Sequence, residues 1–234
     1  MRFYKFFISI FLIFTVCFYI TTPVFSEETT YVWSPNNNSL NDSTNDNSSQ
    51  IKETNSEVNE SNSLSLESGS AILIEQTTGQ VLYSHNAHEQ LRPASVTKVM
   101  SILLIMEALD SNKISLTDSV PCSENAASMG GSQIWLDPRE TLTVDEMLKA
   151  ICVNSANDCV VAMSEFIAGS EEAFVQLMND KAKELGMNDT CFKNCHGLDE
   201  DGHVTSAYDI SLMSRELLVN HPTITNYTTI WTDT

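Results

Sequence analysis

Basic residues are scarce in this sequence. Its 234 residues include 12 lysines and arginines against 31 aspartates and glutamates, which gives a formal net charge of −19. Nucleic acids and anionic lipid surfaces bind proteins with an excess of positive charge, because their phosphates attract lysine and arginine. The charge balance therefore argues against a nucleic-acid partner and against simple adhesion to an anionic membrane.

A pattern of paired cysteines is also missing. The chain has six cysteines, and five of them follow the apolar run at its N-terminus. An odd number does not suit the disulfide framework of a small exported domain. Cys191, Cys195 and His196 could contribute to a metal site, but no second ligand pair has zinc-site spacing, so we predict an ordinary turn and no metal. Cys152 and Cys159 flank an apolar segment and are expected to be core thiols.

The beginning of the chain is unlike a folded domain. Residues 1–26 combine a basic start with an apolar run over 6–20, a pattern typical of a secretory signal, with an uncleaved N-terminal anchor as the alternative. Residues 27–66 are rich in Asn, Ser, Thr and Glu and have no hydrophobic period, which predicts a disordered tether. We therefore expect an exported protein whose folded domain spans residues 67–234, with membrane contact only through an uncleaved signal.

The folded part is predicted to begin with a β-hairpin and to continue mainly with helices. Residues 71–75 and 80–84 have the apolar character of two strands, with a turn between them. Capping boxes at 143–146 and 206–209 mark two helix starts, and the segment 155–158 interrupts the helical pattern. The helices are expected from Ser95 to about Leu109, from Thr143 through Ile151, from Cys159 to Ala168, from Glu171 to Leu185 and from Ser206 through Leu217.

A possible nucleophile and a possible base stand at the start of the most apolar helix. Ser95 and Lys98 are three residues apart, so on a helix they share a face and could meet in a partly desolvated pocket. A buried lysine with a lowered pKa can activate a serine, and a helix N-terminus can hold an oxyanion, so the pair suits acyl transfer through an acyl-enzyme. The alternative is a simple N-cap role for Ser95. Ser49 and Lys52 have the same spacing in the tether, so spacing alone is weak evidence.

A second polar group lies between two apolar helices. Ser155 and Asn157 occupy a short connection, where a hydroxyl can relay a proton and an amide can hold a substrate amide. The alternative is an ordinary turn between helices, capped by Asn157 or Asp158. The two readings stay open on these residues alone.

Taken together, these motifs resemble a known family. The stretch 94–98 and the triplet 155–157 look like the first two motifs of the penicillin-binding serine acyltransferases. The segments 71–79, 131–136 and 196–209 narrow the resemblance to low-molecular-weight D-alanyl-D-alanine carboxypeptidases, similar to peptidase family S11. The resemblance implies an α+β fold of the β-lactamase/transpeptidase type, in which the N-terminal hairpin of an antiparallel sheet lies beside a helical cluster.

The resemblance also implies roles for individual residues. Ser95 would attack the carbonyl between the two terminal D-alanines of a peptidoglycan stem peptide, and Lys98 would accept its proton. Ser155 would pass a proton towards the leaving D-alanine, and Asn157 would contact Lys98 and the substrate backbone. β-Lactam antibiotics would inhibit by acylating Ser95, no cofactor is implied, and the site of action would be the cell envelope outside a bacterial membrane.

Some features depart from the family pattern. Cys195 and Arg139 stand where proline and glycine are common, and His196 and His203 are expected to fix a loop rather than to catalyse. The family's third motif, Lys-Thr-Gly, occurs nowhere in the sequence. We therefore expect a domain truncated at Thr234 before that motif, an incomplete sheet and weakened activity. A class A-like β-lactamase and an inactive remnant are the alternative readings.

Overall fold

The computed structural model describes residues 66–232. The predicted signal at 1–26 lies outside the described residues, and so does the predicted tether up to residue 65. Within residues 66–232, none of the helices is both long and apolar enough to span a membrane.

Two small antiparallel sheets are present in the described part of the chain, and each has two strands. The predicted hairpin is confirmed: β1 (Ala71–Ile74) pairs with β2 (Val81–His85), with Leu73 opposite Tyr83. The second sheet joins β3 (Ser119–Pro121) to β4 (Thr141–Thr143) and was not predicted. Strands of three residues are too short to show the alternation by which a strand is recognised.

The helices account for most of the remaining structure. They are α2 (Lys98–Asp110), α3 (Glu124–Ala127), α4 (Val144–Asn154), α5 (Asn157–Ala168), α6 (Glu171–Glu184), α7 (Ala207–Asn220) and α8 (Thr225–Thr228), with 3-10 turns η1 (Ala94–Thr97) and η2 (Pro222–Ile224). The five longer helices match the predicted segments. Two starts differ from the prediction: Ser95 lies in η1 ahead of its helix, and α5 begins at Asn157 rather than at Cys159.

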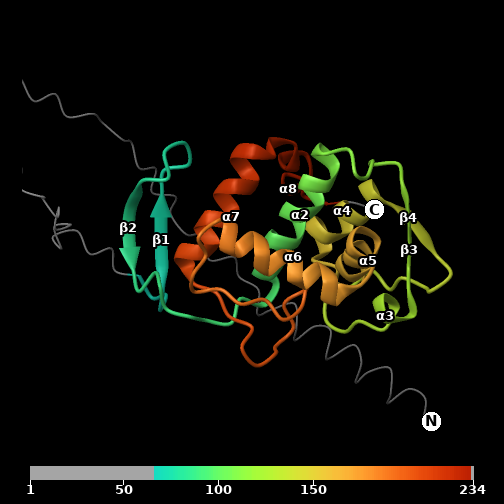
Figure 1. Cartoon of the computed structure of the whole chain (residues 1–234), viewed down its shortest axis with the longest axis horizontal. Helices are drawn as coiled ribbons and strands as arrows, with labels where there is room; N and C mark the ends of the chain where they lie inside the picture. The colour runs from blue at the N-terminus through green and yellow to red at the C-terminus, as the bar shows by residue number, and fades with distance from the viewer. Residues whose placement is uncertain (1–65, 233–234) are drawn as a thin grey trace, which may run out of the picture. The chain divides into compact units, whose positions relative to one another are not determined.

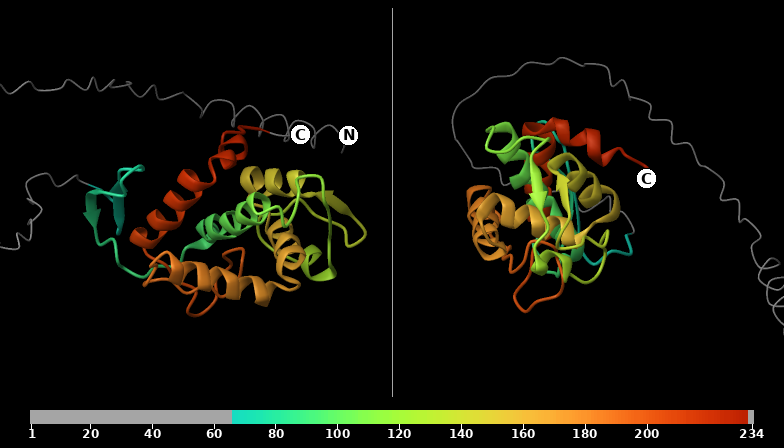
Figure 2. Two further views of the ribbon diagram at one scale, coloured as in Figure 1. Left: turned by 45° about the horizontal axis from the view of Figure 1, so that its top comes forward. Right: turned by 90° about the vertical axis from the view of Figure 1, so that its right-hand side faces the viewer.

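Helix α2 forms the centre of the core. Leu103 and Ile105 are fully buried, and α2 contacts α5, α6 and α7. Figures 1 and 2 show α7 between the β1–β2 hairpin and α2, with α5 on the opposite side of α2 and α6 running alongside α2. Because the apolar surface of α2 is covered from several directions, the residues at its N-terminus enter a dry interior. The predicted α+β arrangement of a hairpin beside a helical cluster is thus confirmed.

The two predicted capping boxes have different outcomes. Thr143 and Glu146 form the complete reciprocal box at the start of α4. At the start of α7, Ser206 Oγ accepts from the backbone N–H of Asp209, but the Asp209 carboxylate accepts from Asp189 N and Thr190 Oγ1. The expected return bond is therefore absent there. The reciprocal bond favours Glu or Gln at this position, and the shorter Asp instead ties the helix to the loop before it.

Candidate active site

Ser95 and Lys98 meet as their spacing predicted. The turn η1 leaves Ser95 exposed, whereas Lys98 opens α2 with 3% of its surface exposed. Lys98 Nζ lies 3.2 Å from Ser95 Oγ and donates to the carbonyl of His196 at 2.8 Å. Burial lowers the pKa of Lys98 to about 8, because removal of water disfavours the charged amine. An amine that loses its proton more readily than an ordinary lysine is thus held against an accessible hydroxyl.

The loop after Cys195 comes very close to the backbone that precedes the serine. Gly197 has a φ of +95°, and a Cβ added there would overlap the carbonyl of Ala94. Ala94 itself has a φ of +47°, which is uncommon for a residue with a side chain. Only glycine combines this backbone conformation with so close an approach, so Gly197 allows the loop to cover the buried amine of Lys98.

Two histidines fix this loop, as expected from the sequence. Lys193 N donates to His203 Nδ1 at 3.0 Å, so the proton of the neutral ring is on Nε2, which lies 2.8 Å from Thr97 Oγ1. Leu198 N donates to His196 Nδ1 at 3.1 Å. Burial lowers the pKa of both histidines and favours these neutral rings.

The Ser155–Asn157 turn is present, but one expected contact is not. Ser155 ends α4 with a φ of +56°, and Asn157 Nδ2 donates to the Gly130 carbonyl at 2.7 Å. Among residues 66–232, no hydrogen bond joins Asn157 to Lys98, and Ser155 Oγ has no hydrogen bond. The predicted Asn157–Lys98 contact is therefore corrected: the amide nitrogen is used by Gly130 and the lysine amine by His196. Asn157 Oδ1 is a buried acceptor without a partner in the described structure.

Asp158 organises the same edge of the site, whereas its place in the sequence predicted only a possible helix cap. Its carboxylate is fully buried and accepts from Ile134 N and Leu136 N, both at 3.1 Å. Between these residues Trp135 has a φ of +65° and is 78% exposed. Asp158 ends the polar segment 155–158, and nothing in that local sequence indicates that its partners lie more than twenty residues away.

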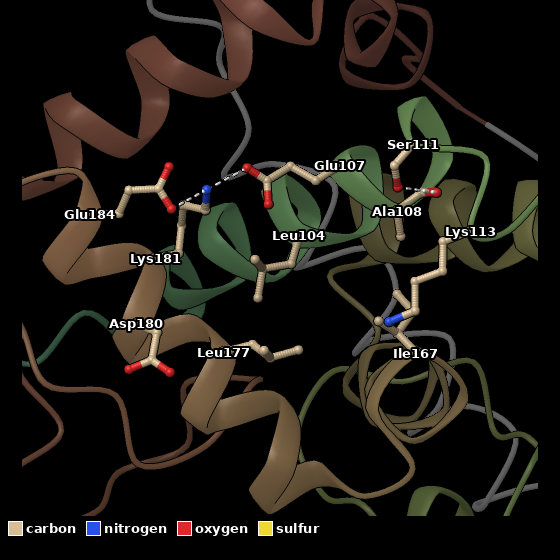
Figure 3. Close-up of a pocket in the computed structure, with 10 residues that line it drawn as sticks. All are labelled: Leu104, Glu107, Ala108, Ser111, Lys113, Ile167, Leu177, Asp180, Lys181 and Glu184. Carbon is tan, nitrogen blue, oxygen red and sulfur yellow. Dashed lines mark hydrogen bonds and ion pairs between the residues drawn. The ribbon is translucent and has the colours of Figure 1, made fainter.

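Two cavities lie elsewhere in the described structure. One, of about 320 Å³, opens between α2, α5 and α6, and Figure 3 shows Lys181 at its rim bridging Glu107 and Glu184, each at 2.8 Å. The other, of about 460 Å³, lies between β1 and α7. Neither is lined by Ser95 or Lys98. Lys181 in the first cavity is occupied by two ion pairs, and the pair with Glu107 joins α6 to α2.

Comparison with known proteins identifies the family of this chain. The family model of D-alanyl-D-alanine carboxypeptidase, peptidase S11, matches residues 54–233. The chain belongs to the peptidase S11 family. The match covers both polar motifs and the loop that carries Gly197, and it begins upstream of residue 67.

Relatives within the S11 family are substantially longer than this chain. D-alanyl-D-alanine carboxypeptidase DacF of Bacillus subtilis is 58% identical over 170 residues, which cover 73% of this chain and 43% of DacF. DacC of Escherichia coli is 37% identical over 164 residues, covering 68% of this chain and 41% of DacC. The chain thus spans less than half the length of these S11 relatives.

Solved structures of S11-like proteins share the fold. The D-alanyl-D-alanine carboxypeptidase DacD of Francisella tularensis matches with a TM-score of 0.69 and 32% identity, over 70% of this chain and 40% of that one. Penicillin-binding protein D2 of Listeria monocytogenes, in its ampicillin-bound form, matches with a TM-score of 0.63 and 29% identity, over 71% of this chain and 68% of that one. The predicted penicillin-binding fold class is therefore confirmed.

Proposed function

We propose that the chain carries the nucleophile and base of a serine-type D-alanyl-D-alanine carboxypeptidase. The reaction is hydrolysis of the terminal D-Ala-D-Ala bond of peptidoglycan stem peptides, in the synthesis and remodelling of the cell wall. The observation that carries the proposal is the buried Lys98 amine, with its pKa of about 8, at 3.2 Å from the exposed Ser95 hydroxyl.

The chemistry follows from the state of the amine. A pKa of about 8 leaves roughly a tenth of the Lys98 amines neutral at pH 7, compared with fewer than one in a thousand for an ordinary lysine. The neutral amine takes the Ser95 proton while Ser95 Oγ bonds to the penultimate D-alanine carbonyl. The C–N bond then breaks, the leaving D-alanine takes a proton, and water hydrolyses the resulting ester.

Ser155 and Asn157 complete the proposed site. Ser155 passes the proton to the leaving amine, which fits a hydroxyl at the end of α4 that makes no hydrogen bond within residues 66–232. Asn157 binds substrate, and its unpartnered buried Oδ1 is an acceptor for a substrate N–H. The backbone N–H of Ser95 supplies one donor for the oxyanion.

The proposal also covers the cellular localisation of the protein and its inhibition by β-lactams. The basic and apolar pattern of residues 1–26 supports export, and the acidic, polar stretch 27–66 supports a tether on the outer side of a bacterial membrane. The ampicillin complex of the Listeria relative supports β-lactams as inhibitors that acylate Ser95. Peptidoglycan stem peptides are accordingly the proposed natural partners.

Labelling with a fluorescent penicillin tests the proposal. The wild-type chain should form a covalent adduct that disappears in Ser95→Ala. Ser49→Ala is a matched control, because Ser49 also precedes a lysine by three residues. Release of D-alanine from a tripeptide that ends in D-Ala-D-Ala should likewise occur with the wild type and Ser49→Ala and disappear in Ser95→Ala. A folded wild-type protein that takes no label would refute the assignment, and rapid release of hydrolysed drug would indicate a β-lactamase instead.

A further inference from the structure

Glu171 lies behind the loop that covers the proposed base. It is the first residue of α6, and its side chain is 19% exposed. Its Oε1 atom accepts from Cys195 N at 3.2 Å and from Cys195 Sγ at 3.3 Å. His196 Nε2 lies 3.4 Å from the same oxygen. Because Leu198 N donates to His196 Nδ1, the proton of the neutral imidazole is on Nε2 and faces Glu171.

The opposite side of the same two loop residues holds helix α2. The His196 carbonyl accepts from Lys98 Nζ at 2.8 Å. The Cys195 carbonyl accepts from Ser101 Oγ at 2.6 Å, and Ser101 is fully buried. The short segment 195–196 is therefore held between a carboxylate on α6 and two side chains on α2. Cys195 N, Cys195 Sγ and His196 Nε2 face Glu171, whereas the two carbonyls face α2.

We propose that Glu171 is a positioning residue for the base: it fixes the His196 carbonyl that directs Lys98 Nζ towards Ser95. The inference rests on the proposed roles of Ser95 and Lys98. Glu171 itself reaches neither Ser95 nor Lys98 through any hydrogen bond in residues 66–232, so it acts through the loop and not on the reacting atoms.

A simpler alternative is that Glu171 only stabilises the start of α6, and Glu172 in the same turn allows the two roles to be compared. Acids in the first turn of a helix stabilise it through the helix dipole, and Glu172 shares that turn but is exposed. A dipole effect alone predicts similar consequences for the two glutamates. Only Glu171 accepts from the segment that holds Lys98, so the two residues separate positioning from helix stabilisation.

The position of the loop also controls how much water reaches the amine. Burial is the main reason that the pKa of Lys98 is low. The titratable groups around it are Cys195 and His196 on the loop, with Glu171 and Glu200 facing His196. A loop released from Glu171 would let water reach Lys98, and the pKa of the amine would rise towards its ordinary value.

The test compares Glu171→Ala, Glu171→Gln and Glu172→Ala in the full chain. The rate constant of penicillin acylation is measured across about pH 6–10, and the labelling amplitude gives the fraction of active protein. Glu171→Ala should lower the acylation rate constant by about 10- to 100-fold, as expected for a misplaced catalytic group. The labelling amplitude should stay unchanged, and the midpoint of the pH–rate profile should move to higher pH. Glu171→Gln should retain most of the rate, since its amide oxygen still accepts from Cys195 N. Glu172→Ala should behave as wild type.

Two results would overturn the inference. One is a Glu171→Ala protein that loses only amplitude or thermal stability while its rate constant and pH midpoint stay unchanged. The other is a Glu171→Gln protein as slow as Glu171→Ala, because the hydrogen-bond acceptor would then not be what matters.

A second readout does not depend on acylation. The ¹³Cε resonance of Lys98, assigned with Lys98→Ala, reports its titration by NMR in a Ser95→Ala background. A raised midpoint in Glu171→Ala supports positioning even if wild-type protein takes no label, a result that would count against the proposed function alone. An unchanged midpoint overturns the inference.

Discussion

A buried amine destabilises the folded state in a way that depends on pH. The pKa of Lys98 falls from 10.5 to about 8 on folding, because burial disfavours its charged form. Between these two values the unfolded chain binds more protons than the folded one, so the free energy of unfolding rises with pH over that window. Below about pH 8 the buried ammonium costs the folded state up to roughly 3 kcal/mol.

Replacing this amine should therefore separate stability from activity. We expect Lys98→Met to raise the free energy of unfolding by about 1–3 kcal/mol at pH 7 and to abolish penicillin acylation. The gain should shrink as the pH rises from 8 to 10.5. Denaturant unfolding at both ends of this range measures it, with the exposed Lys113→Met as the charge-matched control. A loss of stability at pH 7 would mean that the hydrogen bonds of Nζ outweigh its burial.

Gly197 offers a second test at the scale of a single residue. Gly197→Ala places a methyl group against the Ala94 carbonyl at a φ of +95°, so the loop over Lys98 must move. We expect penicillin labelling to be lost or strongly slowed. Gly169→Ala is the control, because Gly169 has a φ of +88° but no atom within 4 Å of an added Cβ, and it should cost only about 1 kcal/mol. Equal effects of the two changes on labelling would contradict this account of the loop.

Residue spacing predicts contacts only within one element. Because η1 runs directly into α2, Ser95 and Lys98 lie in one continuous helical stretch, and their meeting could be predicted from three-residue spacing. The partners of Asn157 and Glu171 lie 27 and 24 residues away, at Gly130 and Cys195, in segments without a periodic pattern. Spacing carries no signal for such pairs. This is why the Asn157–Gly130 hydrogen bond was not predicted and Glu171 was overlooked.

At the scale of elements, Asp158 connects α5 to the segment before β4. Asp158→Ala leaves the N–H groups of Ile134, Leu136 and Cys159 without their carboxylate acceptor in a buried site. We expect a loss of about 3 kcal/mol or more in the free energy of unfolding. Chemical denaturation measures it. Asp137→Ala is the control, because its 44%-exposed carboxylate pairs with Arg139, and it should cost less than about 1 kcal/mol.

Regular elements were predictable where a local signal is strong. The capping box of Thr143 and Glu146 and the apolar period after it place α4 correctly. The strands β3 and β4 carry only three residues each and are defined by pairing with each other across the chain. Such pairing is a property of the folded chain, so no local sequence pattern predicts it.

At the scale of the whole molecule, stability is unevenly distributed. The helical cluster surrounds the fully buried residues of α2 and α5, whereas the hairpin leaves Leu73, Val81 and Leu82 more than 40% exposed. A two-stranded sheet is marginal unless another element covers it. Hydrogen exchange should therefore be fastest in β1–β2 and slowest in α2 and α5, and a hairpin protected as strongly as α2 would contradict this distribution.

One side chain from the helical cluster holds the turn of that hairpin. Arg215 on α7 donates from Nε to the Gln76 carbonyl at 2.8 Å and from Nη2 to the Thr77 carbonyl at 2.7 Å. Arg215→Ala should therefore speed amide exchange in β1–β2 by about fivefold, the equivalent of ~1 kcal/mol, without changing exchange in α2. Arg92→Ala removes an exposed arginine that pairs with Asp199 and should leave the hairpin unchanged. If both variants changed the hairpin alike, net charge rather than the two carbonyl contacts would control its opening.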